Sequence, residues 1–304
     1  MKFFNCLLLF IFSLNVFSSG STGGGAGTAS GQVSSNESKF EGEISEKLKE
    51  GILNYQGDAI GISHKDWDDI VKRHVTFNKD KTSSTINYSK VNINSLKKYT
   101  SALLSVSKAN LDLKSVPFQK AYYFNLYNAL TVELIVENLP LKSIKELGSG
   151  FPLFQSPWKR KFFKLFGEMS HLDRIEHVLV RSNEKLKDPL VHFAFNCASI
   201  GCPALLNKAF TEKNVEDLLQ LATRNFLKDR SRNYFKDNTL YVSSIFKWYE
   251  EDFEQGLRGV NSLKDFFKMY SSSVTDNKRD KEIINSKNYK IKFTDYNWNL
   301  NDTK

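Results

Sequence analysis

The strongest constraint on the fold is a run in which almost every side chain is apolar or aromatic. Residues 122–131 read YYFNLYNALT, inside a segment bounded by Pro117 and Pro140. Proline suits the first turn of a helix, and a proline beyond the end cannot continue it. One long helix is therefore predicted over residues 118–138. A helix that is apolar all round must be buried all round, so other elements have to surround it.

Two asparagines, Asn125 and Asn128, interrupt this apolar run. Asparagine is a poor residue for the interior of a helix, and a buried amide needs hydrogen-bond partners. Three positions apart, the two side chains share nearly one face of the helix. Two interpretations stay open: the amides brace neighbouring loops, or they support a catalytic group in a cleft that both of them face.

Further elements follow from the spacing of apolar residues. Helical periodicity predicts helices over 41–55, 64–77, around 96–104, from 173 to 181, and over 211–228, 243–254 and 263–270. Short extended runs predict strands at 86–88, 190–195, 240–242 and 290–293, and a polar stretch predicts a loop at 275–288. Residues 41–304 are therefore predicted to form a single α+β domain that is mostly helical and contains a small β-sheet.

The N-terminus has the pattern of a targeting segment. Lys2 precedes an apolar stretch at residues 3–17, which is too short for a comfortable membrane span, and small residues follow at 18–21. We expect a signal peptide at residues 1–20, a flexible Gly/Ser-rich leader at 21–40, and export to the periplasm or outside the cell. An uncleaved anchor is the alternative. Cys6 lies inside the apolar stretch and not at the cleavage point, which argues against lipidation.

The chain is basic, with 43 Lys and Arg against 34 Asp and Glu and a formal net charge of +9. Cleavage after residue 20 leaves +8, because Lys2 is the only charged residue removed. The charge favours contact with anionic surfaces, but export argues against nucleic acid as a partner. A mean hydropathy of −0.41 excludes a multi-span membrane protein. The expected partner is an unidentified substrate in the envelope or outside the cell.

Two cysteines remain after cleavage, Cys197 and Cys202, in a turn-rich segment behind the predicted strand 190–195. A strand-end turn presents a thiolate together with backbone N–H donors, as a nucleophile requires. His177 is the expected base, because His192 lies five residues before Cys197 and would face the other side of a regular strand. Asn125, Asn128 or Glu176 would orient the histidine or polarise a carbonyl. Asp173, His177 and Arg181 are each four residues apart and share one helix face.

Three other interpretations of the cysteines stay open. In an oxidising compartment they could form a disulfide, they could bind zinc together with His177 and His192, or they could be inert buried residues. We expect no zinc and no cofactor, because strand parity separates His192 from Cys197. The sequence contains no glycine-rich phosphate loop, G-x-S-x-G elbow, H-E-x-x-H motif or EF-hand pattern.

Five segments of the chain resemble the DUF547 family, in its exported bacterial branch. They are AYYFNLYNALTV (121–132), LPLKSI (139–144), IEHVLVR (175–181), DPLVHFAFNCASIGCP (188–203) and SIFKWYEEDF (244–253). The resemblance covers about residues 64–300. Plant-like members keep the position of Cys197 but not that of Cys202, which implies that a disulfide or a four-ligand zinc site is not essential to the family. His171 departs from the family, which usually has Ser at this helix start.

The resemblance implies a site made of Asn in the aromatic helix, Glu176-His177 in the next helix and Cys197 in the loop. This set is similar in residue type to thiol hydrolases and acyltransferases of the papain and transglutaminase kind. The predicted function is a thiol-dependent hydrolase or acyl/amide transferase with Cys197 as nucleophile and His177 as base. The alternative is a non-catalytic envelope binding module whose polar cluster holds a cleft together.

Overall fold

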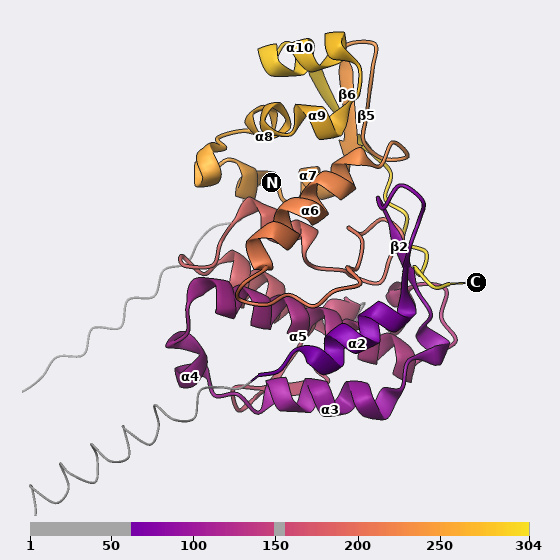
Figure 1. Cartoon of the computed structure of the whole chain (residues 1–304), viewed down its shortest axis with the longest axis vertical. Helices are drawn as coiled ribbons and strands as arrows, with labels where there is room; N and C mark the ends of the chain where they lie inside the picture. Colours follow the sequence, from indigo (N-terminus) through magenta and orange to yellow (C-terminus); the bar gives the residue numbers. More distant parts are fainter. Residues whose placement is uncertain (1–61, 149–155, 304) are drawn as a thin grey trace, which may run out of the picture. The chain divides into compact units, whose positions relative to one another are not determined.

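The computed structural model describes residues 62–148 and 156–303 (Figure 1). The chain divides into two units, Met1–Ala59 and Ile60–Lys304, and every described residue belongs to the second. The predicted signal peptide (1–20), leader (21–40) and helix 41–55 lie outside the described residues, so those predictions are untested. Within the described ranges, no helix combines the length and apolar character needed to span a membrane.

Helices dominate the described part of the chain, which confirms a mostly helical α+β fold. The α-helices are α2 (Lys65–His74), α3 (Ile93–Leu104), α4 (Lys108–Asp112), α5 (Val116–Glu137), α6 (Val215–Lys228), α7 (Ile245–Trp248), α8 (Leu263–Met269), α9 (Ser271–Val274) and α10 (Lys278–Ser286). A π-helix forms η4 (Arg174–Arg181). Short 3₁₀ helices occupy several connections: η1 (Tyr88–Lys90), η2 (Ile144–Gly148), η3 (Pro157–Lys159), η5 (Pro189–Phe193), η6 (Glu250–Phe253) and η7 (Leu257–Gly259).

Helix α5 is the predicted central helix. Ser115 caps it, with Oγ accepting a hydrogen bond from the N–H of Phe118 at 3.2 Å, and Pro117 stands in its first turn. Every residue from Ala121 to Val132 is buried. Helices α3 and α6 and the π-helix η4 pack against it (Figure 1). The burial predicted from the apolar run is confirmed.

Asn125 and Asn128 bind the backbone of segments that pack on α5. Asn125 donates from Nδ2 to the carbonyl of Phe210 at 2.7 Å and accepts from the N–H of Phe210 at 3.0 Å. Asn128 donates to the carbonyl of Ala194 at 2.8 Å and accepts from the N–H of Asn196 at 2.9 Å. Both halves of each amide are therefore used in bracing, and Asn128 fixes the start of the loop that carries the cysteines.

In the described ranges, β-structure is confined to small sheets. β1 (Val75–Phe77) pairs antiparallel with β2 (Ser84–Ile86), and β3 (Phe163–Leu165) pairs antiparallel with β4 (Glu168–Ser170). β5 (Tyr234–Lys236), β6 (Thr239–Ser243) and β7 (Lys290–Thr294) form a sheet in that order, with β6 and β7 parallel. Asp237 and Asn238 join β5 to β6 with φ of 48° and 53°, left-handed values that a tight hairpin turn requires and that these residues tolerate.

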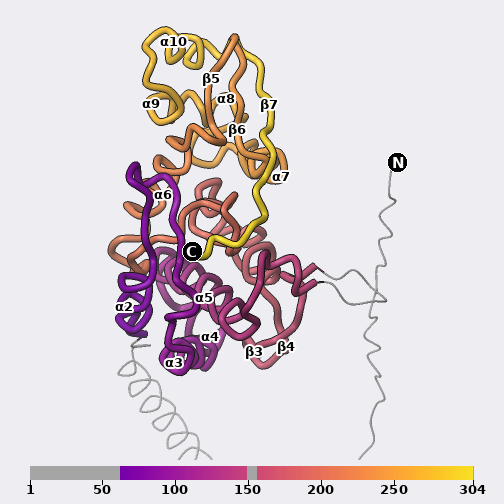
Figure 2. The backbone as a smooth tube through the Cα atoms, turned by 90° about the vertical axis from the view of Figure 1, so that its right-hand side faces the viewer, coloured from indigo at the N-terminus to yellow at the C-terminus, as the bar shows by residue number. Residues whose placement is uncertain are grey.

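The segment after β7 returns to the loop that follows η5 (Figure 2). The N–H of Ile200 donates to the carbonyl of Asn299 at 2.9 Å, and that of Gly201 donates to the carbonyl of Asn297 at 2.8 Å. In the reverse direction, the N–H of Asn301 donates to the carbonyl of Ala198 at 3.1 Å. The residues that carry the cysteines are therefore held between α5 and the last residues of the chain.

Two predicted elements are wrong. The predicted strand 190–195 is largely the 3₁₀ helix η5, which Pro189 opens and Asp188 caps by accepting from the N–H of Leu190 at 2.9 Å. A short run that is apolar on every side suits a buried helical turn as well as a buried strand. The predicted loop 275–288 contains α10, capped by Asn277, whose few apolar residues give only a weak periodic signal.

We predict that Asn125→Ala lowers the free energy of unfolding by about 2–4 kcal/mol. The change leaves the buried N–H and carbonyl of Phe210 without partners, and each unsatisfied group costs about 1–3 kcal/mol. Urea unfolding followed by circular dichroism measures the loss. Asn285→Ala, at an exposed position on α10, is the control and should change stability by no more than about 0.5 kcal/mol. A loss below about 1 kcal/mol for Asn125→Ala would contradict the bracing role.

We predict that His64 makes the protein less stable in mild acid. Its Nδ1 lies 2.8 Å from the hydroxyl of Tyr99, and burial lowers its pKa from 6.5 to about 4. Between these values the unfolded chain binds the proton and the folded chain does not, so stability falls as pH falls. From pH 7 to pH 5 the free energy of unfolding should drop by about 1–2 kcal/mol through this residue. In urea titrations His64→Gln should flatten this dependence, and an unchanged slope would refute the assignment.

Candidate functional site

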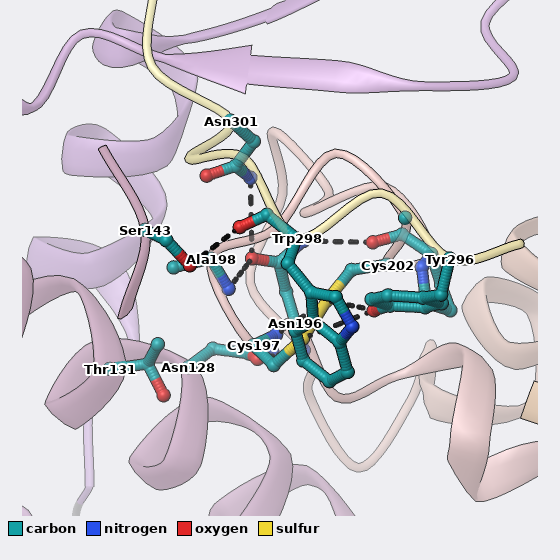
Figure 3. Close-up of a disulfide and its surroundings, with 12 residues drawn as sticks. Asn128, Thr131, Ser143, Asn196, Cys197, Ala198, Cys202, Tyr296, Trp298 and Asn301 are labelled. Carbon is teal, nitrogen blue, oxygen red and sulfur yellow. Dashed lines mark hydrogen bonds between the residues drawn. A yellow bond between two sulfur atoms is a disulfide. The ribbon is translucent and has the colours of Figure 1, made fainter. Parts of the chain in front are cut away.

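The loop behind η5 carries both cysteines of the predicted site. Asn196 shapes it, because its Oδ1 accepts from the N–H of Ala198 at 3.0 Å and its Nδ2 donates to the carbonyl of Pro203 at 2.8 Å. Cys197 and Cys202 form a disulfide with their Cα atoms 6.2 Å apart (Figure 3). The N–H of Cys197 donates to Cys202 Sγ at 2.9 Å. Of the interpretations that the sequence left open, the structure contains the disulfide.

Tyr296, from the segment after β7, lies against this disulfide. Its hydroxyl is 3.2 Å from Cys197 Sγ and 3.1 Å from Cys202 Sγ (Figure 3). Burial raises the pKa of Tyr296 above its ordinary value, so the phenol stays protonated and able to donate to sulfur. The two sulfurs differ in exposure, since Cys202 is buried and Cys197 is only partly buried.

A cavity of about 160 Å³ lies beside the disulfide. A cavity of about 150 Å³ in another protein binds benzene, so this one has room for a group of that size. The predicted residues Cys197, His177 and Glu176 all line it. Its remaining walls are mainly aromatic or ionisable and include Tyr127, Trp158, Asp173, His192, Trp248, Tyr249, Tyr296 and Trp298.

His177 lies on η4 with both ring nitrogens engaged. Nε2 is 3.5 Å from Asp173 Oδ1, and Nδ1 contacts Arg181 Nη1. Arginine only donates, so Nδ1 accepts, and the neutral ring carries its proton on Nε2, toward Asp173. The shared face predicted for Asp173, His177 and Arg181 therefore exists. In the described part of the chain no hydrogen bond joins His177 to Cys197, whose sulfur contacts Tyr296.

His192 is a wall of the same cavity, and its predicted position on the face opposite Cys197 is wrong. That prediction needed the regular alternation of a strand, which η5 does not have. His192 Nε2 lies 2.7 Å from Asp252 Oδ2, and its ring stacks on Tyr249 with centroids 4.0 Å apart. Its Nδ1 is buried with no hydrogen-bond partner.

Burial keeps His192 neutral, and Asp252 fixes which ring nitrogen carries the proton. Burial lowers the pKa of His192 and outweighs the opposing effect of Asp252. Burial works to raise the pKa of Asp252, but hydrogen bonds from His192 and Arg181 prevail and hold it well below its ordinary value. Arg181 reaches the carboxylate from Nε at 2.6 Å and from Nη2 at 3.1 Å. The neutral imidazole thus donates from Nε2 and keeps a lone pair on Nδ1.

Glu176 is a buried carboxyl group in the wall beside His177. Only 8% of the residue is exposed, and Tyr249 donates its hydroxyl proton to Oε1 at 2.9 Å. Burial, together with this acid, raises the pKa of Tyr249 above its ordinary value. Within the described ranges Glu176 forms no ion pair.

Asn125 and Asn128 are buried, as predicted, but neither is among the residues that line the cavity. Their amides are used on the backbone, as described above, and Asn128 reaches the site only through Asn196. The catalytic roles predicted for all five residues, Cys197, His177, Glu176, Asn125 and Asn128, remain predictions.

The donor groups of the site are engaged with protein partners. Among the described residues, no three His, Cys, Asp or Glu side chains come together in a way that could hold a metal ion. Cys197 and Cys202 are bonded to each other, and His192 Nε2 is held by Asp252. The four residues of the zinc alternative, His177, His192, Cys197 and Cys202, therefore do not form a shared ligand set.

Sequence reasoning considered His192 but placed it away from Cys197, and it did not name Asp252 and Tyr249 as parts of the site. Asp252 and Tyr249 stand in the segment 244–253, which carried part of the family resemblance and was not used for function. The available signal was the presence of an acidic and an aromatic side chain, Asp252 and Tyr249, within one short helical segment. Their partner lies 60 residues earlier in the chain, a separation that no local pattern bridges.

Fold and site together define a mostly helical α+β protein with a cysteine–histidine cavity. Residues 113–227 match the family model described as "Protein of unknown function, DUF547", so this part of the chain is similar to that family. The match begins just before α5 and ends in α6, and it includes η4, η5 and the cysteine loop. Asp252, Tyr296 and Trp298 lie outside it. No curated protein and no solved structure gives a significant match.

We predict that Gly201→Ala displaces the ring of Tyr296 from the disulfide. A Cβ at this position would lie 2.7–2.8 Å from three ring atoms, so the ring must move. Overpacking of this kind costs about 1–3 kcal/mol, which chemical denaturation measures. In a Tyr296→Ala background the same change should cost little, because the ring is absent. Equal losses in both backgrounds would show that Tyr296 is not the obstacle.

Proposed function

We propose that the protein is a thiol-dependent hydrolase or acyl/amide transferase, with Cys197 as the nucleophile once its disulfide is reduced. The observation that carries this proposal is the position of Cys197 in the wall of a cavity that also contains His177, His192 and Glu176. Cys197 is preferred over Cys202 because it is the more exposed sulfur. Thiolate reactivity requires such access to a polar site.

The disulfide is the oxidised, resting form in this proposal. An external dithiol supplies two electrons, becomes a disulfide itself and leaves thiols on Cys197 and Cys202. The histidine takes the proton of the Cys197 thiol, and the thiolate attacks a carbonyl carbon. The bond to the leaving nitrogen or oxygen then breaks, and the protonated histidine gives its proton to the leaving group. Water or a second nucleophile then loses a proton to the histidine and displaces the thiol from the thioester.

Two histidines compete for the role of base. His177 was the expectation from the sequence, and it is the more exposed of the two. His192 is favoured by its partners, because Asp252 orients the ring through Nε2 and Nδ1 keeps a free lone pair. A carboxylate that holds one imidazole nitrogen while the other accepts a proton is the arrangement of known catalytic triads.

We predict that Cys197 of the reduced protein reacts with limiting iodoacetamide at least ten-fold faster than Cys202. Partial exposure and a histidine in the same wall favour the Cys197 thiolate. Peptide mass mapping after reduction and desalting gives both rates. Cys202→Ser is the matched control, since Cys197 should then react without reductant. His192→Gln and His177→Ala identify the base by which of them slows Cys197, with melting temperatures confirming that each variant folds.

Equal labelling of the two cysteines, or no labelling of folded reduced protein, would reject the nucleophile. If labelling succeeds, p-nitrophenyl acetate should acetylate Cys197 in the reduced protein and leave Cys197→Ser unmodified. Alkylation without acetylation would limit the site to thiol reactivity and reject acyl transfer.

A non-catalytic binding module is the second candidate. It is favoured by the contacts of the disulfide, since both sulfurs lie within hydrogen-bond distance of Tyr296 and aromatic side chains surround them. In this case Cys197 stays oxidised in the working protein, and the cavity holds a ligand without chemistry.

We also propose that the protein works in the periplasm or outside the cell. The apolar segment at residues 3–17 and the small residues behind it support this proposal. A disulfide agrees with an oxidising compartment. N-terminal sequencing of protein recovered from the medium or periplasm of expressing bacteria tests it, and an intact Met1 in the cytoplasmic fraction alone would reject it.

A further inference from the structure

One side of the cavity is built almost entirely from large aromatic rings. We call Trp158, Trp248, Tyr296 and Trp298 the aromatic wall. Trp298 lies at the centre of the wall, with its ring centroid 4.4 Å from that of Tyr296, 5.6 Å from that of Trp158 and 5.7 Å from that of Trp248. Figure 3 shows Trp298 and Tyr296 close to the disulfide. Trp248 is 47% exposed although it is a large apolar residue, and such exposure in a cavity is typical of a ligand surface.

The described wall of the cavity also contains two carboxyl groups and no Lys or Arg side chain. Its ionisable walls are Asp173, Glu176, His177 and His192. Glu176 is buried, and its hydrogen-bond partners Tyr249 and Tyr127 are both neutral phenols. The nearby cation Arg181 is committed to Asp252 by two hydrogen bonds. In a chain with a net charge of +9, a cavity with carboxylates in excess is selective for a positive ligand.

The rings of this site already accept cations. Lys145 Nζ lies 3.7 Å from the centroid of Trp298, and the guanidinium carbon of Arg181 lies 4.5 Å from that of Tyr249. Lys145 is not among the residues that line the cavity, so the interior of the cavity stays accessible to a ligand. Aromatic faces combined with carboxylates form the usual binding site for ammonium groups.

We propose that the cavity binds the alkylammonium group of the substrate, with the aromatic wall holding the alkyl part and Glu176 and Asp173 holding the charge. The inference rests on the proposed function in that it names the substrate class of the same site, an amide or ester that carries a cationic amine. The volume of about 160 Å³ fits a short alkylammonium chain.

The test uses n-butylammonium as the probe and n-butanol as its neutral counterpart of similar length. Both are titrated into the oxidised full-length protein at constant ionic strength, so that cavity binding is measured without any thiol chemistry. Tryptophan fluorescence and isothermal titration calorimetry follow binding. We expect n-butylammonium to bind at least ten-fold more tightly than n-butanol.

The variants separate charge from aromatic contact. Glu176→Gln should weaken n-butylammonium at least five-fold and leave n-butanol unchanged, whereas Trp298→Leu should weaken both. Glu184→Gln is the matched control, because this carboxylate is exposed and lies outside the cavity wall, and its affinity should equal that of the unchanged protein. If Glu176→Gln does not fold, as judged by its melting temperature, Asp173→Asn gives the same readout from the more exposed carboxylate.

Equal affinity for amine and alcohol would overturn the proposal, as would binding of N-acetylglucosamine in place of n-butylammonium. A Glu176→Gln variant that binds the amine as tightly as the Glu184→Gln control would also overturn it. These outcomes are independent of Cys197, because the disulfide is intact throughout. A failed binding test with successful Cys197 labelling would remove the substrate class and keep the enzyme.

Discussion

The burial of helix α5 on every side is the constraint on which the rest of the structure depends. No water reaches its central turns, so Asn125 and Asn128 must satisfy their amides on protein groups. Both do so on backbone, at Phe210 and at Ala194 and Asn196. These bonds hold two chain segments in register against the helix. The cysteine loop therefore starts from a fixed point, and the site inherits its position from the core.

The other end of the cysteine loop is fixed from a distant part of the chain. The final segment forms backbone hydrogen bonds with Ala198, Ile200 and Gly201. The same pairing brings Tyr296 onto the disulfide and Trp298 into the cavity wall. The absence of a side chain at Gly201 allows the tyrosine ring to approach closely. The backbone hydrogen bonds that hold the final segment on the cysteine loop therefore also place Tyr296 and Trp298 in the cavity wall.

Two carboxyl groups of the site, Asp252 and Glu176, have different kinds of partner. Asp252 is neutralised by Arg181 and orients His192. Glu176 has the phenols of Tyr249 and Tyr127 as hydrogen-bond partners and forms no ion pair within the described ranges. The first acid orients a histidine, whereas the second is the one that we propose to recognise a positive group. This difference connects the proposed chemistry to the proposed substrate class.

The sequence was informative about local structure, where residue spacing within one helix or strand carries the signal. The burial of α5, the helical majority, β6 and β7, and the shared face of Asp173 and His177 all follow from the spacing of residues along the chain. The residues 190–195 could not be assigned in this way, because a fully buried run has no polar side to reveal its period. Parity then placed His192 on the wrong side of Cys197. Cys197, Glu176 and His177 could be named from residue type and resemblance, and they do line one cavity.

The sequence by itself determined that a central apolar helix is surrounded and that a cysteine loop stands near a Glu-His pair. Only the tertiary structure decided which histidine has a carboxylate partner, that the asparagines bind backbone, and that Tyr296 and Trp298 close the site. The physical reason is distance along the chain: His192 and Asp252 are 60 residues apart, and Cys197 and Tyr296 are 99 apart. Contacts of that range are set by how whole helices pack, and local periodicity carries no record of them.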